Sequence, residues 1–143
     1  MQNDKEKRQI ILDFMKRHNL GVISTADLNA RPEAAVVEFG ETNKLELIFD
    51  AFNQSKKCRN IEENNKVAFV IGWDENITVQ YEGEASELKG DELKTYKERY
   101  FEKNPRAKKW EGRKGISYFK IVPHWIRYSD LNKNPWEIFE IEP

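Results

Sequence analysis

The sequence predicts a mainly β domain in which about six or seven antiparallel strands form a closed or nearly closed barrel, with helices at the connections between strands. Two observations lead to this fold class. Short apolar and β-branched segments recur along the chain between turn residues. In residues 76–83, Ile77, Val79 and Tyr81 alternate with polar residues, which indicates a strand with one buried face. The length of 143 residues fits one domain that spans residues 1–143.

The segments with strand character are separated by turn residues. Pro32 restricts the residue before it to extended conformations, so a turn is expected before the second strand. Residues 40–43 are expected to form the hairpin turn between the second and third strands, and residues 74–75 the turn between the fourth and fifth. The strands are expected at residues 20–26, 34–39, 44–49, 66–73, 76–83, 115–122 and 124–128.

Helical patterns precede or interrupt these strands. In the first, apolar residues such as Ile10 and Phe14 recur at helical spacing. The second begins at Ser55, and the third begins with Asp91 as its N-cap and ends before Pro105. The helices are expected at residues 4–18, 55–64 and 91–103.

Charge, cysteine content and the lack of long apolar runs argue against several classes of protein. Lys plus Arg number 24 and Asp plus Glu 25, which gives a formal net charge of −1. A dedicated nucleic-acid-binding protein usually has a basic excess, so nucleic acid is not an expected partner. The single cysteine, Cys58, cannot form an internal disulfide, and no apolar run approaches the roughly 20 residues of a membrane span. Together with a polar N-terminal segment, these features predict a cytoplasmic protein that has no membrane partner.

The most informative local feature is a pair of lysines at the start of the second expected helix. With Ser55 as the N-cap, Lys56 and Lys57 fall in the first helical turn. A helix N-terminus carries partial positive charge and unpaired N–H groups, which disfavours lysine there unless an anion binds. A phosphate would accept hydrogen bonds from the backbone and from Ser55 while the lysines neutralise its charge. The alternative is that both lysines point into solvent.

The sequence Ser55-Lys56-Lys57, directly after a strand end, is the central match to one known family. The chain resembles the pyridoxamine 5'-phosphate oxidase-like family of FMN-binding split barrels, in which Ser-Arg/Lys-Lys at a helix start contacts the FMN phosphate. The order of the preceding helix and strands also matches. The resemblance covers roughly residues 4–87 and, more loosely, 116–128. It implies a dimeric split β-barrel of about six to seven antiparallel strands with peripheral helices and bound FMN.

The resemblance also implies a cofactor site built from several segments. Residues of the second strand would border the flavin, Asp50 would lie at the end of the next strand, and the Ser-Lys-Lys sequence would hold the phosphate. Thr78 stands where the family's oxidases often carry a glutamine that reaches the flavin. The two subunits of a homodimer share each flavin in this family, so a partner chain would complete the site. The cofactor-binding residues expected on this basis are Ala35, Val36, Val37, Glu38, Asp50, Ala51, Ser55, Lys56, Lys57 and Thr78.

Two departures from the family's vitamin-processing oxidases argue against the oxidation of pyridoxamine 5'-phosphate. Those enzymes carry an arginine three residues after the turn proline, where this sequence has Ala35. They also end with an Arg-x-His segment that grips the substrate phosphate, and the tail of this sequence contains no such segment. The expected function is that of an FMN-dependent oxidoreductase acting by hydride transfer at flavin N5. Its small substrate is unidentified, NADH or NADPH is a candidate reductant, and no catalytic side chain is assigned.

Other kinds of site have less support. His18 and His124 are the only histidines, and no cluster has metal-ligand spacing, so no metal site is predicted. Cys58 is interpreted as a buried structural cysteine. The basic segment 106–114 has the composition of a nucleic-acid patch, but it is interpreted as a solvated loop in which Trp110 packs on the barrel. Three alternatives remain open: a non-catalytic module that holds flavin or haem on the same fold, a nucleic-acid or protein-interaction barrel that uses this basic segment, and a deazaflavin in place of FMN.

Overall fold

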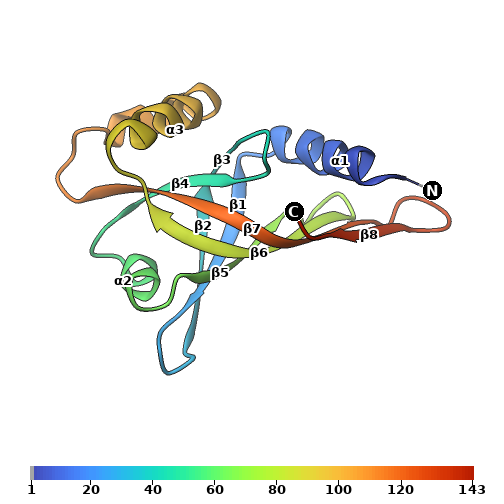
Figure 1. The fold of residues 1–143 in the computed structure, drawn as a ribbon, viewed down its shortest axis with the longest axis horizontal. Helices are drawn as coiled ribbons and strands as arrows, with labels where there is room; N and C mark the ends of the chain where they lie inside the picture. Colours follow the sequence, from blue (N-terminus) through green and yellow to red (C-terminus); the bar gives the residue numbers. More distant parts are fainter. Residues whose placement is uncertain (1) are drawn as a thin grey trace.

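One antiparallel sheet of eight strands forms the frame of the chain, which a computed structural model describes for residues 2–143 (Figure 1). The hydrogen-bonded order of seven strands is β2-β1-β5-β6-β7-β4-β3. The eighth strand, β8, is not part of this order and pairs with β7 alone. The mainly β, antiparallel architecture expected from the sequence is confirmed. Met1, the first residue of the expected domain, lies outside the described residues. The strands are β1 (Leu20–Ala26), β2 (Pro32–Glu38), β3 (Gly40–Glu41), β4 (Leu47–Phe52), β5 (Lys66–Ile71), β6 (Ile77–Glu87), β7 (Ile116–Asp130) and β8 (Glu137–Ile141).

The sheet curls so that its two sides approach each other. β2 is an edge strand of the hydrogen-bonded order, yet it contacts β4, which lies next to the opposite edge. Side chains from successive strands fill the inner face, as expected for a small barrel whose interior is packed rather than hollow. The line where β2 faces β4 is therefore the split of the barrel. The largest inner side chains, each at most 1 % exposed, include Ile23, Phe39, Phe49, Phe69, Tyr81 and Ile121.

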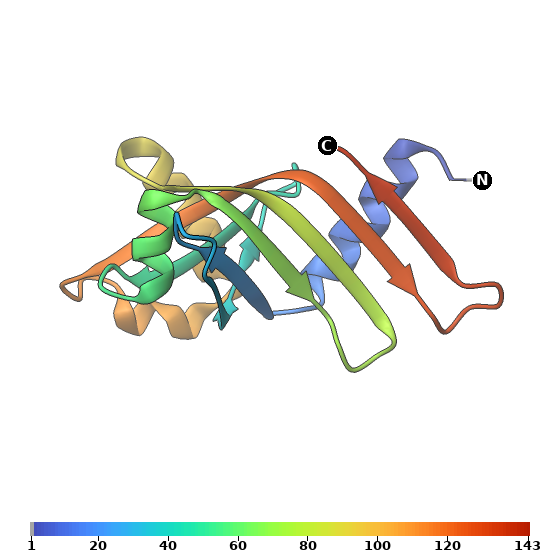
Figure 2. The ribbon, with the colours of Figure 1, turned by 90° about the horizontal axis from the view of Figure 1, so that it is seen from below.

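Helices cover the two ends of the sheet (Figure 2). α1 (Asp4–Lys16) lies beside β8, whereas α2 (Lys56–Glu63) and α3 (Gly90–Lys103) lie at the other end. α3 begins after Lys89 rather than at an Asp91 N-cap. Asp91 instead lies in the first turn, where its charge still favours the positive helix end. Among the described residues, no helix has the length and apolar character needed to cross a membrane.

The segments 115–122 and 124–128, expected as two strands, form the single long strand β7. Pro123 does not end this strand, because it lies opposite Gly83, where the register between β6 and β7 shifts. A proline is tolerated at such a bulge because the regular hydrogen-bond ladder is interrupted there. A Cβ atom on Gly83 would lie 2.3 Å from the carbonyl oxygen of Val122, so this close approach requires glycine. β6 accordingly continues past Gly83 to Glu87.

The hairpin after β2 lies a few residues later than expected. The turn was expected at residues 40–43, but Gly40 and Glu41 form β3 and the turn follows them. The Thr42 N–H donates to the carbonyl of Glu46 at 3.0 Å, and Leu45 adopts a positive φ of 66° to close the turn. The hydroxyl of Tyr81 donates to the Leu45 carbonyl at 2.8 Å, so a tertiary hydrogen bond from β6 also stabilises the turn.

Two further elements lie in segments expected to be irregular. The tail forms β8, which pairs with β7. The basic segment after α3 begins with the 3₁₀ helix η1 (Pro105–Trp110). α3 and η1 cover a second, smaller core on the side of β4 and β7 away from the barrel interior. Its buried members are Ile48, Leu88, Tyr100, Phe101, Ala107 and Tyr118.

Candidate functional site

A cavity of about 290 Å³ lies at the split of the barrel, where β2 and the end of β4 meet the start of α2. The sequence placed these three segments at one cofactor site, and the structure brings them together around one cavity. Residues of α3, η1 and β7 complete its wall. Seven of the ten residues predicted from the sequence line this cavity: Val36, Val37, Glu38, Asp50, Ala51, Ser55 and Lys57.

The start of α2 forms the basic end of the cavity. Ser55 is the N-cap, as expected, and its hydroxyl accepts a hydrogen bond from the backbone N–H of Cys58 at 3.4 Å. The first turn of α2 contains no acidic residue. The helix end, with its partial positive charge and free N–H groups, therefore has no negative side chain of its own to compensate it. This arrangement suits a bound anion.

A buried polar contact fixes α2 against the sheet. Asn60 is 6 % exposed, and its side-chain amide donates to the hydroxyl of Thr25 on β1 at 3.0 Å. The apolar side of the helix is completed by Ile61, which is also buried. Because α2 is anchored to β1 in this way, its N-terminus is held beside β2.

The two lysines predicted to hold a phosphate differ in position. Lys57 is half-buried and lines the cavity, whereas Lys56 is exposed and does not. Lys57 precedes the buried Asn60 and Ile61 by three and four residues, which places it on the inward side of the helix. The apolar Ile61, four residues after Lys57, was thus a usable sequence signal for the difference between the two lysines.

Two carboxyl groups lie on the wall formed by β2 and β4. Glu38 ends β2, and Asp50 lies on β4. The hydroxyl of Tyr100 on α3 donates to Asp50 Oδ1 at 3.1 Å. Burial, followed by the negative charge of Glu38, raises the pKa of Asp50, although the Tyr100 hydrogen bond and Lys57 oppose this shift. The cavity therefore has a basic end at α2 and a carboxyl-bearing wall.

Residues that the sequence analysis did not place at the site form the rest of the wall. The Trp110 ring meets Phe52 edge-on, with 6.1 Å between ring centroids, and the guanidinium of Arg113 lies 4.9 Å from the Trp110 centroid. The expectation that Trp110 packs on the barrel is confirmed. These residues are Phe52, Tyr100, Ala107, Trp110 and Ile116. Phe52 directly follows Ala51 on β4 and Ile116 begins β7, whereas the other three reach the cavity only because α3 and η1 fold over the sheet.

Two further predicted residues lie outside the cavity of this chain. Ala35 is partly buried and packs against the main core. Thr78 pairs with Ser129, near the end of β7, whereas the cavity residue Ile116 is at the start of that strand. Thr78 therefore does not line the cavity of its own chain.

The histidines and the cysteine occupy ordinary structural positions. Just beyond α1, His18 Nδ1 lies 2.8 Å from the Phe14 carbonyl and Nε2 lies 2.7 Å from a Glu75 carboxylate oxygen. The side chain of His124 on β7 is 58 % exposed. Cys58 is buried, and burial raises the pKa of its thiol, which makes the reactive thiolate scarce. In the part of the chain that the structure describes, no three potential ligands come together to hold a metal ion.

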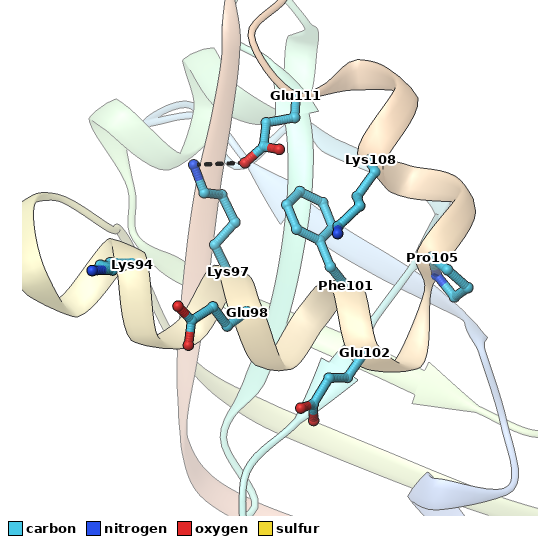
Figure 3. Close-up of a pocket in the computed structure, with 8 residues that line it drawn as sticks. All are labelled: Lys94, Lys97, Glu98, Phe101, Glu102, Pro105, Lys108 and Glu111. Carbon is cyan, nitrogen blue, oxygen red and sulfur yellow. Dashed lines mark ion pairs between the residues drawn. The ribbon is translucent and has the colours of Figure 1, made fainter.

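A second, larger hollow of about 610 Å³ lies between α3 and η1 (Figure 3). Lys97 Nζ and Glu111 Oε2 are 3.1 Å apart across it, and the Phe101 ring lies between the two helices. Three lysines and three glutamates line this hollow, and none of its lining residues was predicted from the sequence as a cofactor contact. The smaller cavity at the barrel split is therefore the better candidate site.

Comparison with known proteins identifies the family. Residues 8–130 match the pyridoxamine 5'-phosphate oxidase family. The chain belongs to this family. The resemblance inferred from the Ser55-Lys56-Lys57 segment is thereby confirmed. A comparison with curated proteins gives no match.

Solved structures share the split-barrel fold of this pyridoxamine 5'-phosphate oxidase family member. General Stress Protein 26 from Bacillus anthracis is 26% identical, with a TM-score of 0.74 over 95% of this chain and 99% of that one. An FMN-binding, pyridoxamine 5'-phosphate oxidase-related protein from Nostoc punctiforme is 13% identical, with a TM-score of 0.66 over 95% and 96%. The heme binding protein from Mycobacterium smegmatis is 16% identical, with a TM-score of 0.80 over 99% of this chain. This chain spans only 59% of that protein's length.

Proposed function

We propose that this family member binds FMN in the cavity at the barrel split and acts as an FMN-dependent oxidoreductase. One observation carries the proposal: the cavity joins the N-terminus of α2, with Ser55 and Lys57, to the exposed edge of β2. The helix end offers N–H donors and a lysine to a phosphate, and β2 offers backbone groups to a ring. This combination fits a ligand with a phosphate at one end and a flat, polar ring system at the other.

The volume of the cavity indicates how much of the cofactor it would enclose. Sites for ligands of drug size usually measure about 300–1,000 Å³, and this cavity of about 290 Å³ lies at the low end. It would hold the phosphate and part of the remaining cofactor. The rest of the ring system would then extend along β2, where Val36 is 62 % exposed.

The chain's own residues would bind, orient and shield the cofactor. Lys57 and the helix end would neutralise the phosphate, and Trp110 with Phe52 would exclude water from the cavity mouth. Bound flavin would supply hydride transfer at its N5 atom. The proposed substrate is a small molecule other than pyridoxamine 5'-phosphate, because Ala35 replaces the arginine of the vitamin-processing oxidases.

Haem is the alternative ligand, since one structural relative is a heme binding protein. A haem site needs an axial ligand, most often histidine, cysteine, methionine or tyrosine. The described cavity wall has no histidine, cysteine or methionine, and the hydroxyl of its one tyrosine, Tyr100, is bonded to Asp50. The donor set therefore favours FMN.

The visible spectrum of the freshly purified protein tests the cofactor, and stopped-flow mixing with NADH or NADPH tests the reaction. We expect the absorbance of an oxidised flavin, which anaerobic NADH or NADPH bleaches. A haem spectrum would contradict the choice of cofactor. Flavin that binds tightly but is not reduced by either nucleotide would support the non-catalytic module instead.

We further propose that two copies of the chain share each site. On the outer face of the sheet, Val36, Val22 and Val70 lie directly opposite one another across β2, β1 and β5. This apolar row continues from the exposed edge of the cavity, so a second copy on it would cover the part of the cofactor that the cavity leaves open. In such a dimer Thr78, which does not line its own chain's cavity, would contribute to the cavity of the partner.

Sedimentation of the FMN-loaded protein should give twice the chain mass of 17.0 kDa. Val70→Lys should produce monomers and release flavin, because it places a charge in the proposed seam. Gln9→Lys, on the exposed side of α1, is the matched control and should leave both the mass and the flavin unchanged. A wild-type monomer that retains FMN at micromolar concentration would contradict the shared site.

A further inference from the structure

The basic segment 106–114 reaches the mouth of the cavity through Trp110, which ends η1 and lines the cavity wall. Directly after it, the backbone N–H of Arg113 donates to the Trp110 carbonyl at 3.1 Å and closes a tight turn. Gly112 adopts a φ of 79° in this turn, a conformation that favours glycine. The turn brings the guanidinium of Arg113 back to 4.9 Å from the centroid of the Trp110 ring.

The pairing of β4 with β7 places this turn beside the start of α2. Just beyond the last paired residues of the two strands, the N–H of Asn53 donates to the carbonyl of Gly115 at 2.7 Å. Arg113 precedes Gly115 by two residues, and Ser55, the N-cap of α2, follows Asn53 by two. Neighbouring strands lie about 4.8 Å apart, so a long side chain from the turn can reach an anion bound at the start of α2.

We propose that Arg113 is a second cation of the cofactor site and binds the phosphate of FMN together with Lys57. The inference rests on the proposed function, because it assigns a further residue to the phosphate end of that site. A phosphate monoester carries a charge of about −1.5 to −2 at pH 7, so Lys57 alone does not neutralise it. Lys56 is exposed and does not line the cavity, whereas Arg113 lies at the cavity mouth.

The positive charge of Arg113 is not used within the chain. The one acidic residue of the segment is Glu111, and its Oε2 lies 3.1 Å from Lys97 Nζ on the far side of η1 (Figure 3). Among residues 2–143, Arg113 forms no ion pair. The cation–π contact with Trp110 restricts the guanidinium but leaves most of its five N–H donors free. Such a planar fork matches a phosphate by donating two hydrogen bonds.

Lys109 is a matched control for Arg113. Its Nζ also lies 4.9 Å from the centroid of the Trp110 ring, and it too is exposed and forms no ion pair in the described chain. Lys109 belongs to η1, however, whereas Arg113 belongs to the turn that Gly115 joins to the end of β4. Lys109→Gln therefore removes the same charge from the same ring without removing a group from the edge beside α2.

The binding test titrates FMN and riboflavin into wild type, Arg113→Gln and Lys109→Gln, with quenching of flavin fluorescence as the readout. Arg113→Gln should weaken FMN binding about tenfold and change riboflavin binding by less than about threefold, because only FMN carries the phosphate. Lys109→Gln should change both affinities by less than about threefold. Arg113→Lys should lie between wild type and Arg113→Gln, since lysine keeps the charge but not the planar fork.

Phosphorus NMR of bound FMN measures the charge around the phosphate directly. A nearby cation favours the dianion, so it lowers the second pKa of the phosphate, which is about 6 in an unbound monoester. This pKa should be lower in wild type than in Arg113→Gln and the same in wild type and Lys109→Gln. A change in the packing of Trp110 alone would not produce this difference.

Three outcomes would overturn the inference. They are equal FMN affinity in wild type and Arg113→Gln, equal losses in Arg113→Gln and Lys109→Gln, and equal losses of FMN and riboflavin in Arg113→Gln. The proposed function would survive each of them if wild type binds FMN and Lys57→Ala weakens that binding. A wild-type protein that binds no flavin would overturn the proposed function and, with it, the role of Arg113.

Discussion

Lys57→Ala should weaken FMN binding about 10- to 150-fold, the effect expected on losing a charge-assisted hydrogen bond of about 1.5–3 kcal/mol. The reason is that Lys57 lines the cavity beside the N-terminus of α2, where the phosphate is proposed to bind. Riboflavin, which has no phosphate, should lose much less affinity. Isothermal titration of both ligands into wild type and variant measures the difference.

Lys56→Ala is the matched control, because Lys56 has the same charge and is adjacent in sequence but is exposed and does not line the cavity. Its effect on FMN should be within about threefold, as for an exposed charge. The sequence alone assigned the phosphate to both lysines. Equal losses of FMN and riboflavin in Lys57→Ala would place the phosphate elsewhere, and equal effects of the two variants would restore the sequence-based assignment.

Lys103→Met should lower the free energy of unfolding by about 3 kcal/mol, because it leaves a buried carboxylate without its partner. Lys103, at the end of α3, forms an ion pair with Glu41 of β3, and the two side chains are only 13 % and 12 % exposed. Its Nζ also donates to the Met15 carbonyl at 2.8 Å, which joins the end of α1 to α3. Burial lowers the pKa of Lys103 in spite of Glu41, so desolvation takes up much of the pair's attraction.

Urea unfolding followed by circular dichroism measures the change. Adding Glu41→Gln to Lys103→Met should recover most of the lost stability, since the double variant has no unpaired buried charge. Lys133→Met is the control: Lys133 also pairs with a glutamate, Glu137, but its side chain is 56 % exposed, and the loss should be below about 1 kcal/mol. Equal losses for Lys103→Met and Lys133→Met would contradict the interpretation.

Most secondary structure could be predicted because the signals are local. The alternation in β6 and the N-cap at Ser55 depend on residues within a few positions of one another. The errors occur where distant residues decide the local conformation. The turn after β3 is stabilised by Tyr81, and β7 passes through Pro123 because Gly83 lies opposite it.

The sequence by itself determined the family, the antiparallel strands and most of the cofactor segment, since these follow from short-range patterns and one motif. Only the tertiary structure decided which polar groups face the cavity. Tyr100 bonds to Asp50 although the two are 50 residues apart in sequence, and Trp110 reaches the cavity only because η1 folds over the sheet. The raised pKa of Asp50 depends on burial and on side chains of α3, β2 and α2, which no local pattern specifies. Burial and long-range contacts exist only after the chain has packed, so these features could not be derived from the order of residues alone.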